Sequence, residues 1–379
     1  MDEFLLNQTT AGNQSQPSVV GFRGTQFVAV WEDHSGETIK GRLFGVNGAP
    51  SDAEFLVNIP GKPGTKRQLP RVVETDQGFA VAWIERPPTG LAQLKLRTFD
   101  QDTLSGPESV VSTAEPELLI RPAMTRLSDG GFAIVWADKR ANERIRLQRF
   151  GIDGTKNGSE LRANTTAGLH REPMVAGLTN GNIAVGWRAR ITGPLHLRLQ
   201  IFDAKGPAGG EQIPNIEITD ANMAPLDSGQ FAIAHIRNAG DGEPGFETTV
   251  TQASIFEAGG SFARRFPGTS APRIVSSWPA IAALSGGRFL VAWTEVNVDK
   301  PAAGTNVGAR IVSAQGPLGQ AIRVNTQTGG NRFSLSAATT SGPEGDTAFF
   351  VWNDDTKTSA DQSGQAVKGR VLAMPAKGF

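Results

Sequence analysis

Five basic side chains in the middle of this sequence are of types that could bind an anion. They stand at the ends of short apolar runs, where most equivalent positions elsewhere in the chain carry an acid. Arg presents a planar fork of N–H donors that suits carboxylates, sulfates and phosphates. An aromatic ring that could stack on a sugar lies in the segment SerSerTrpPro. We therefore expect a ligand-binding site at His170, Arg171, Arg188, Arg190, Arg237 and Trp278.

Catalytic and metal-binding motifs are largely missing from the sequence. The chain has no Cys and no Tyr, which excludes thiolate chemistry and a Tyr acid or base. Its four His, at positions 34, 170, 196 and 235, lack the close spacing of a local metal site. Residues 240–245 match GxGxxG, but a Pro lies inside the match and no helix follows to cradle phosphate. We expect no metal and no cofactor.

The elements that position these residues follow from a repeat. Trp closes a short apolar run at positions 31, 83, 136, 187, 293 and 352, and the interval from 187 to 293 is about twice the others. His235 closes an equivalent run in that interval. Repeats of this length are typical of propellers, solenoids and arrays. The spacing therefore predicts seven units.

Each unit contains four predicted strands. In the clearest copy the first strand is 122–127, the second 131–136, the third 145–150 and the fourth 160–164. The runs are too short for buried helices, and Gly-rich turns between the first and second strands favour tight hairpins. A four-stranded antiparallel sheet cannot bury both faces alone, whereas seven arranged radially bury them against one another. We predict an all-β, seven-bladed β-propeller.

The two ends of the sequence predict how the ring closes. Residues 3–7 (EFLLN) match residues 54–58 (EFLVN), a fourth strand, but no first three strands precede them. The last unit ends before a fourth strand of its own. We expect the N-terminal strand to complete the last blade, which removes exposed sheet edges. A closed ring cannot be divided without exposing its core, so we expect residues 1–379 to form one domain.

Composition excludes some partners. With 37 basic and 37 acidic residues the net charge is zero, so no global field attracts nucleic acid. No stretch is long enough to span a membrane. Residues 1–7 have neither a basic segment nor a long apolar core, so we expect no signal peptide in this chain, and we expect a monomer.

The repeat pattern resembles a known family. The pattern is Gly, an apolar run ending in Trp, then Arg-Phe, then Asp-Gly, then Glu followed by Asn-Thr, and it is clearest in residues 131–165 and at 321–331. This pattern is similar to the tandem propeller repeats of large exported bacterial proteins of the RTX type. The resemblance covers the whole chain and is weakest in the fifth unit, where His235 replaces Trp and Pro225 interrupts the first strand. It implies export and a surface or binding role, and it transfers no catalytic motif.

One face of the predicted disc is the candidate site. The loops from second to third strands and from fourth strands into the next blade lie on the same face. The intervals 235–256, 293–312 and 352–372 are longer than 31–44, 83–99, 136–150 and 187–202, so blades five to seven carry longer loops there. Insertions on one face of a repeat protein often build its binding surface.

Charges on that face follow a rule that the middle blades break. Most blades have an acid just after the Trp, and several have a base entering the first strand, which we interpret as a repeated ion pair. The acids are Glu32, Asp33, Glu85, Asp138, Glu295 and Asp354, and the bases are Arg67, Arg121, Arg171 and Arg332. In blades four and five, basic residues follow the second strand instead, which predicts an uncompensated basic sector.

The aromatic residues divide into two classes. Six Trp at one repeat position are expected to pack between blades. Trp278 lies outside that register, in the predicted loop into blade six, and is the candidate stacking residue. His235 is interpreted as a local change in packing.

We expect a non-catalytic binding or adhesion module for an acidic glycan or a protein surface. The alternatives are a glycan-processing hydrolase or lyase using Glu295 and Asp354 with His235 or Arg190, and a scaffold subunit of a larger assembly. Two acids facing each other across the channel would favour hydrolysis, whereas acids paired with Arg would favour binding.

Overall fold

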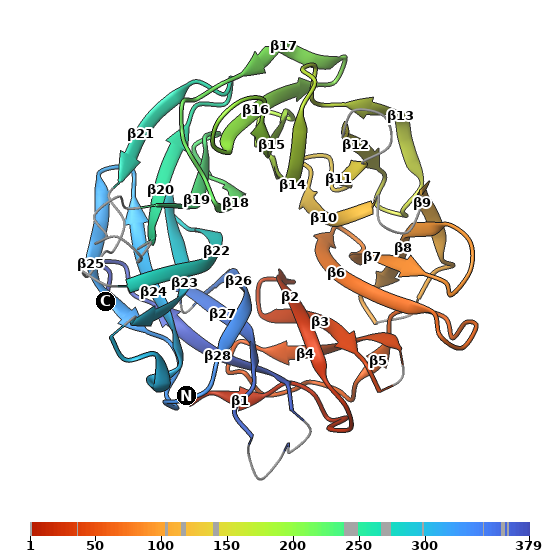
Figure 1. Ribbon diagram of the computed structural model, residues 1–379, viewed down its shortest axis with the longest axis vertical. Coiled ribbons are helices and arrows are strands. Elements are labelled where there is room, and N and C mark those ends of the chain that lie inside the picture. The colour runs from red at the N-terminus through yellow and green to blue at the C-terminus, as the bar shows by residue number, and fades with distance from the viewer. Residues whose placement is uncertain are drawn as a thin grey trace.

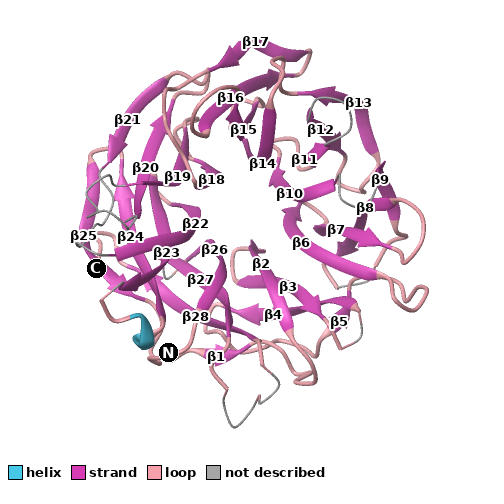
Figure 2. Cartoon of the chain, in the orientation of Figure 1, coloured by secondary structure: helices cyan, strands magenta, loops and turns pink. Residues whose placement is uncertain are grey.

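The chain folds into seven four-stranded antiparallel sheets arranged in a ring around a central channel (Figures 1 and 2). The computed structural model describes residues 2–35, 37–102, 105–114, 119–138, 144–238, 249–266, 274–297, 299–343, 345–357, 361 and 364–379. The prediction of an all-β propeller with seven blades is confirmed.

Each blade runs from an innermost first strand to an outermost fourth strand (Figure 1). The strands are β2 (Gln14–Phe22), β3 (Gln26–Asp33), β4 (Thr38–Gly45) and β5 (Phe55–Leu56) in blade one; β6 (Lys66–Thr75), β7 (Gly78–Arg86), β8 (Ala92–Asp100) and β9 (Ser109–Ala114) in blade two; β10 (Leu119–Arg126), β11 (Phe132–Asp138), β12 (Arg144–Phe150) and β13 (Lys156–Arg162) in blade three; β14 (Leu169–Gly177), β15 (Ile183–Arg190), β16 (His196–Asp203) and β17 (Gly206–Gln212) in blade four; β18 (Asp220–Pro225), β19 (Phe231–Asn238), β20 (Thr249–Phe256) and β21 (Phe262–Phe266) in blade five; β22 (Ile274–Leu284), β23 (Arg288–Asn297), β24 (Thr305–Ser313) and β25 (Gly316–Arg323) in blade six; and β26 (Arg332–Gly342), β27 (Gly345–Asp354), β28 (Ala366–Met374) and β1 (Phe4–Leu5) in blade seven. In the described part of the chain, the one helix is the short 3-10 turn η1 (Pro301–Ala303), and no helix there has the length and apolar character needed to cross a bilayer.

The N-terminal strand closes the ring as the sequence predicts. β1 pairs antiparallel with β28, with Phe4 opposite Gly369 and Leu5 opposite Lys368. The Leu6 N–H continues this ladder by donating to the Val367 carbonyl at 2.9 Å. Blade seven therefore contains strands from both ends of the sequence, and the first and last strands lose their free edges.

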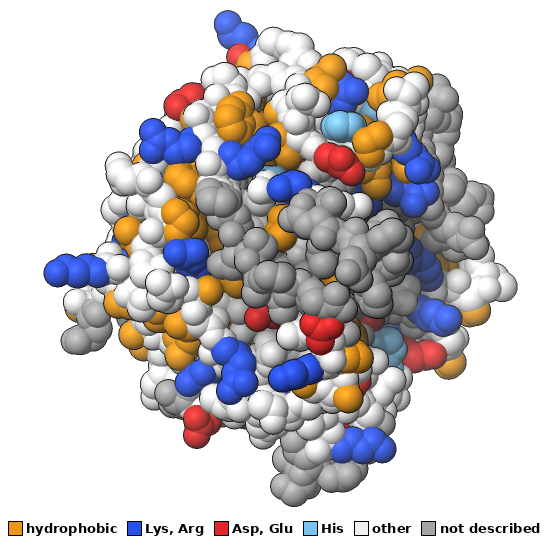
Figure 3. Space-filling view, turned by 60° about the vertical axis from the view of Figure 1, so that its left-hand side comes forward, with side chains coloured by type: hydrophobic (Ala, Val, Ile, Leu, Met, Phe, Trp, Pro, Cys, Tyr) orange, Lys and Arg blue, Asp and Glu red, His pale blue; other side chains and the backbone are white. Residues whose placement is uncertain are grey.

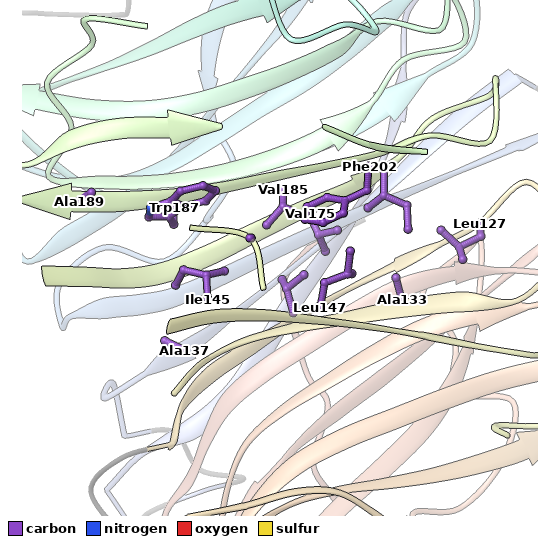
Figure 4. Packing of buried hydrophobic residues seen from close by; sticks show 13 residues of the cluster. Leu127, Ala133, Ala137, Ile145, Leu147, Val175, Val185, Trp187, Ala189 and Phe202 are labelled. Atoms are coloured by element: carbon purple, nitrogen blue, oxygen red, sulfur yellow. The ribbon is translucent and has the colours of Figure 1, made fainter. Parts of the chain in front are cut away.

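Seven separate apolar clusters hold the blades together, one at each interface between neighbours. The six repeat Trp side chains are at most 2% exposed, so their predicted packing between blades is confirmed. Figure 4 shows the interface of blades three and four, where Trp187 and Val185 face Ile145 and Leu147 of the preceding blade. Burial of side chains this large is a major source of stability because it removes 150–250 Å² per aromatic residue from water.

The interface between blades four and five is the exception because His235 replaces Trp there. The His235 side chain is fully buried, and its Nε2 lies 3.0 Å from the Ser254 hydroxyl. Met174, Met223 and Ile218 fill the apolar part of this interface. Met adapts to irregular space, which agrees with the interpretation of His235 as a local change in packing.

An Asn that follows the fourth strand extends its pairing with the third strand in four blades, at Asn7, Asn58, Asn164 and Asn325. The Asn58 side-chain oxygen accepts the Ile39 N–H at 2.7 Å. In blade seven the Asn7 oxygen accepts the Val367 N–H at 3.1 Å in the same way. The match between residues 3–7 and 54–58 therefore has a shared hydrogen-bonding function.

A Glu in or beside the fourth strand connects blades one, two, four and seven to the preceding blade. The Glu211 carboxylate of blade four accepts the N–H groups of Thr165 and Thr166, at 2.9 and 3.3 Å, from the segment that follows blade three. Glu3 of blade seven accepts the Thr326 N–H at 2.9 Å. These bonds satisfy backbone donors at the junction between blades.

Two predicted strand boundaries are wrong for physical reasons. The first strand of blade three begins at Leu119 rather than Pro122, because the Pro lies in a β-bulge where it need not donate to the ladder. The fourth strand begins at Lys156 rather than Glu160, directly after the turn. Pro225 does not interrupt its strand either, since it is the last residue of β18 and lies opposite Phe231.

Leu6→Ala should lower the free energy of unfolding by about 2–4 kcal/mol, since the side chain is fully buried where the ring closes. Urea unfolding monitored by circular dichroism measures the change. Leu56→Ala, on the outer surface of the equivalent strand and 45% exposed, is the control and should change stability by less than about 0.5 kcal/mol. Equal effects of the two substitutions would show that β1 does not close the ring.

Glu211→Gln should lower stability at pH 7 by about 2 kcal/mol because charged hydrogen bonds to the preceding blade are weakened. Burial raises the pKa of the Glu211 carboxyl, but the bonds from Thr165 and Thr166 outweigh it and hold the pKa below 4.5. A depressed folded-state pKa contributes stability above pH 4.5 that is lost as pH falls through the folded value. The difference from wild type should therefore shrink in urea titrations at pH 3.5. Exposed Asp227→Asn is the control; a difference independent of pH would contradict the prediction.

Candidate functional site

Six of the seven first strands carry a β-bulge opposite the repeat Trp. The ladder between first and second strands skips a residue at this position in every blade except blade five, where β18 and β19 pair without a break. Five of the six bulges contain a residue followed by Pro, and the sixth has Leu in place of Pro. The pairs are Gln16-Pro17, Leu69-Pro70, Arg121-Pro122, Glu172-Pro173, Trp278-Pro279 and Ser334-Leu335.

The first residue of most bulges has a left-handed backbone. Its φ is 52° at Gln16, 57° at Leu69, 48° at Glu172, 51° at Trp278 and 53° at Ser334. Such a conformation costs about 1–3 kcal/mol for a residue with a side chain and is concentrated at functional sites. Bulges also turn a side chain away from the direction that the regular strand would give it.

The first strands enclose a cavity of about 380 Å³ at the centre of the ring. The bulge residues Arg121, Glu172 and Trp278 line it, and so does Asp220 at the start of β18. Ser334 is fully buried instead, and Leu69 packs against the core between blades two and three. Blades three to six therefore supply the polar and aromatic lining near the candidate face.

Charged side chains line the cavity from several blades: those considered for ligand binding come from blades three, four and five, and Arg71, Glu74 and Arg126 also line it. Glu172 of β14 forms an ion pair of 2.8 Å with Arg188 of β15. Arg121 of β10 and Asp220 of β18 lie on either side of this pair along the ring. Across the channel, the centre of the Arg121 guanidinium is 5.7 Å from the ring centroid of Trp278, which is within cation–π range.

Arg121 and Asp220 have opposite charges but are not joined directly. Among the residues that the structure describes, neither forms an ion pair within 4.0 Å, and the shielded Arg121 Nε has no hydrogen-bond partner. The Asp220 carboxylate accepts the Ala221 N–H at 2.9 Å. The channel therefore holds a cation whose donors are not saturated.

Burial and neighbouring charges shift the pKa of both groups. Burial, and next the nearby Glu172 carboxylate, raise the pKa of Asp220 to about 6, although Arg121 and Arg188 oppose this shift. Burial lowers the pKa of Arg121, against the effect of Asp220, Glu172 and Glu32. An Arg side chain nevertheless stays charged near neutral pH.

His170 is fully buried and serves the blade. Its Nδ1 accepts the Trp187 indole N–H at 2.9 Å, which leaves Nε2 to donate to the Thr166 carbonyl at 3.1 Å. Both ring nitrogens thus have hydrogen-bond partners within the protein.

The predicted Arg residues lie at neighbouring strand ends, but the sector is not uncompensated. Arg171 lies opposite Arg188, and Arg190 lies opposite Leu169 at the end of the same pair of strands. Arg188 is compensated, since it pairs with Glu172. Arg190 is exposed. Arg237 lies near the end of β19, the second strand of blade five, and donates to the Asn238 carbonyl at 2.9 Å.

Trp278 is placed differently from the prediction. It lies within β22, in the bulge equivalent to that of Glu172, and not in a loop outside the repeat register. The side chain is partly buried against the core of blades six and seven, and it faces Arg121 across the channel. The predicted position on the candidate side of the ring, however, agrees with the structure, because the bulge lies beside the end of the second strand.

The expected ion pair between the entering base and the acid after the Trp is confirmed in two blades. Arg67 bonds Glu85 at 2.9 Å in blade two, and Arg332 bonds Asp354 at 3.2 Å in blade seven. Arg121, however, lies at the bulge, two residues beyond this position, and therefore reaches the channel. Its assignment to the repeated pair is wrong because the bulge shifts the register of β10 by one residue at this point.

The acids and the His named for a glycan-processing enzyme form hydrogen bonds or ion pairs within their own blades. Asp354 is fully buried and also bonds Lys368 at 3.1 Å. Glu295 accepts the Trp293 indole N–H at 2.6 Å. Burial, with smaller effects from Arg265 and Arg237, lowers the pKa of His235 to about 3, so its imidazole is neutral.

The long loops of the candidate face lie largely outside the described residues. The predicted extensions of blades five and seven fall at 239–248, 358–360 and 362–363, and Gly240–Gly245 falls there too. Over the described atoms on the side of blades five and six, Lys and Arg side chains are interspersed with acidic ones (Figure 3). The part of the chain that the structure describes contains no group of three or more His, Asp or Glu suited to a metal ion.

A recurring signal could have located the channel residues from sequence. Xaa-Pro stands in five units with its Pro 13 or 14 positions before the repeat Trp, and the residue before the Pro differs from blade to blade. Pro within a first strand indicates a bulge, which singles out Arg121, Glu172 and Trp278. Asp220 has no such signal.

Comparisons with known proteins support the architecture. No family model matches the chain, and no curated protein matches its sequence. Among solved structures, the chain is similar to an ulvan lyase bound to -[GlcA(1-4)Rha3S]-, with 11% identity over 97% of this chain and 96% of that one and a TM-score of 0.59. It is similar to the hydrazine synthase of Kuenenia stuttgartiensis, with 13% identity over 99% of both chains and a TM-score of 0.58. It is also similar to the β-propeller domain of the Trilobed protease of Pyrococcus furiosus, with 10% identity over 94% of both chains and a TM-score of 0.55. That domain is described as having an open velcro topology, whereas β1 and β28 close the ring here. At these identities the similarity shows the propeller fold.

Proposed function

We propose that this propeller is a non-catalytic binding or adhesion module that holds an acidic glycan at the mouth of its central channel. The observation that carries the proposal is the Arg121 guanidinium, which lines the channel opposite Trp278 without forming an ion pair among the described residues. A buried cation without a counterion favours an anionic ligand. Arg188 and the exposed Arg190 stand at the rim, where they would contact the rest of the glycan.

The dimensions of the channel agree with this proposal. A volume of about 380 Å³ lies at the lower end of small-molecule sites, so it could receive one or two sugar units. Polar and apolar surfaces contribute about equally to the walls, and a few charged groups converge on the cavity, as in specific binding sites. A neighbouring propeller, the ulvan lyase, is bound to -[GlcA(1-4)Rha3S]-; for this chain the choice of an acidic glycan rests on Arg121.

The location and assembly state are part of the same proposal. The resemblance of the repeats to those of RTX-type exported proteins supports placement outside the cell or on its surface, and the protein would act as a monomer. A protein surface rich in carboxylates is the alternative ligand, because Arg190 and Arg237 would recognise it by the same chemistry.

A second candidate function, a glycan-processing enzyme, is favoured by one observation. Asp220 and Glu172 line the same cavity, and the pKa of Asp220 is raised to about 6 partly by the Glu172 charge. Two carboxyl groups in different environments can divide the roles of general acid and general base. Asp220 would then protonate a leaving oxygen while Glu172 activates water.

The double variant Arg188→Ala/Arg190→Ala should bind acidic glycans at least about tenfold more weakly than wild type, because two charged contacts at the rim are lost. Biolayer interferometry with heparin and polygalacturonate measures the affinity, with neutral arabinan as the non-binding comparison. Arg23→Ala/Lys205→Ala is the matched control, since both residues are exposed on the opposite side of the disc.

Undiminished binding by the Arg188/Arg190 variant would remove the rim from the site. Failure of the wild type to bind any acidic polymer would overturn the glycan proposal. Release of new reducing or unsaturated ends from either polymer, lost in Asp220→Ala, would establish the enzyme instead.

A further inference from the structure

We propose that Arg121 receives the carboxylate or sulfate group of the ligand, and that the Asp220 carboxylate opposes this group until Asp220 is protonated. The inference rests on the proposed function and names the chemistry of its central contact. It makes binding strongest under mildly acidic conditions.

The Arg121 guanidinium has hydrogen-bond donors that the protein does not use. The residue comes from the bulge of β10 and reaches the cavity, where the guanidinium carbon lies over the Trp278 ring, 5.7 Å from the ring centroid. A cation–π contact with the ring does not use up the N–H donors of the guanidinium. The shielded Nε has no hydrogen-bond partner. The side chain therefore keeps donors for an acceptor that is not part of the protein, and a planar anion matches the geometry of a guanidinium.

The net charge around Arg121 depends on whether Asp220 is ionised. Glu172 is committed to Arg188 at 2.8 Å, so it does not neutralise Arg121 directly. The charged groups that face Asp220 from neighbouring strands are Glu172, Arg121 and Arg188. With Asp220 ionised, these four groups have no net charge, and an incoming anion would meet one repelling carboxylate near its binding site. With Asp220 protonated, the cluster has one positive charge.

Protonation of Asp220 also gives its side chain a hydrogen-bond donor. Burial and the Glu172 charge keep this carboxyl partly protonated near pH 6. A neutral carboxyl has an O–H donor that the ionised form lacks. The protonated side chain would therefore donate to the ligand anion while Arg121 binds it from the other side. One proton is taken up for each anion bound.

Binding of two small probes, sodium sulfate and sodium glucuronate, tests the inference in the intact protein. Both probes keep their charge between pH 5 and 7, so any pH dependence comes from the protein. The indole N–H signal of Trp278, assigned with Trp278→Phe, reports binding by NMR. The affinity should be about tenfold higher at pH 5 than at pH 7, because the neutral fraction of Asp220 changes by that factor. Whichever probe binds more tightly identifies the preferred anion.

Two variants separate the roles of the residues. Asp220→Asn keeps the shape and a donor but cannot ionise, so its affinities at pH 5 and pH 7 should agree within about twofold. Arg121→Gln should abolish binding of both probes, and Arg121→Lys should restore part of it. Arg23→Gln is the control, since Arg23 is exposed on the opposite side of the disc, away from the cavity. It should bind like wild type. Thermal unfolding of each variant verifies folding, and Arg121→Lys keeps the test decisive if Arg121→Gln is unstable.

The outcomes distinguish this inference from the proposed function. If heparin or polygalacturonate binds through Arg188 and Arg190 but Arg121→Gln has no effect, the function stands and the inference is overturned. If the small anions bind with the expected pH profile but no polymer does, the anion site stands and the glycan function falls. A pH profile that persists in Asp220→Asn would overturn the role of Asp220. If no probe and no polymer binds, both proposals fall.

Discussion

The structure depends on burial of blade faces against one another around a closed circle. No sheet of four short strands can cover both of its faces, so each blade is stable only between two neighbours. The Trp and apolar side chains at each interface meet this requirement six times within the continuous chain, and the seventh interface needs both ends of the sequence. Pairing of β1 with β28 is therefore the condition on which the geometry of the channel rests.

The fold could be predicted from sequence because its signals are local and repeated. An apolar run ending in Trp defines a second strand, and a Gly turn before it defines a hairpin. The motif from Glu54 to Asn58 recurs at Glu3 to Asn7 because both copies make the same bonds: the Asn oxygen accepts an N–H from the third strand, and the Glu binds backbone of the preceding blade. A repeated motif with a repeated hydrogen-bonding function is enough to predict how the ring closes.

The site could be predicted only in part, because it consists of departures from the repeat. The basic character of blades four and five and the importance of Trp278 were visible in the sequence. Which side chains enter the channel was not, since a bulge shifts the strand register and changes the face to which each residue points. Arg67 and Arg121 look equivalent in sequence, yet one forms an ion pair in its blade and the other lines the cavity. Glu172 is marked in the sequence only by the Pro that follows it, and Asp220 carries no motif at all.

The bulges have a consequence for how such a protein can diversify. In three blades the first residue of the bulge lines the channel, and it is a different residue from the repeat Trp that packs between blades. At these positions one blade presents Arg121, the next Glu172 and another Trp278 on nearly the same backbone. Substitution of a few such residues would therefore change which ligands the channel binds, while the packing between the blades stays the same.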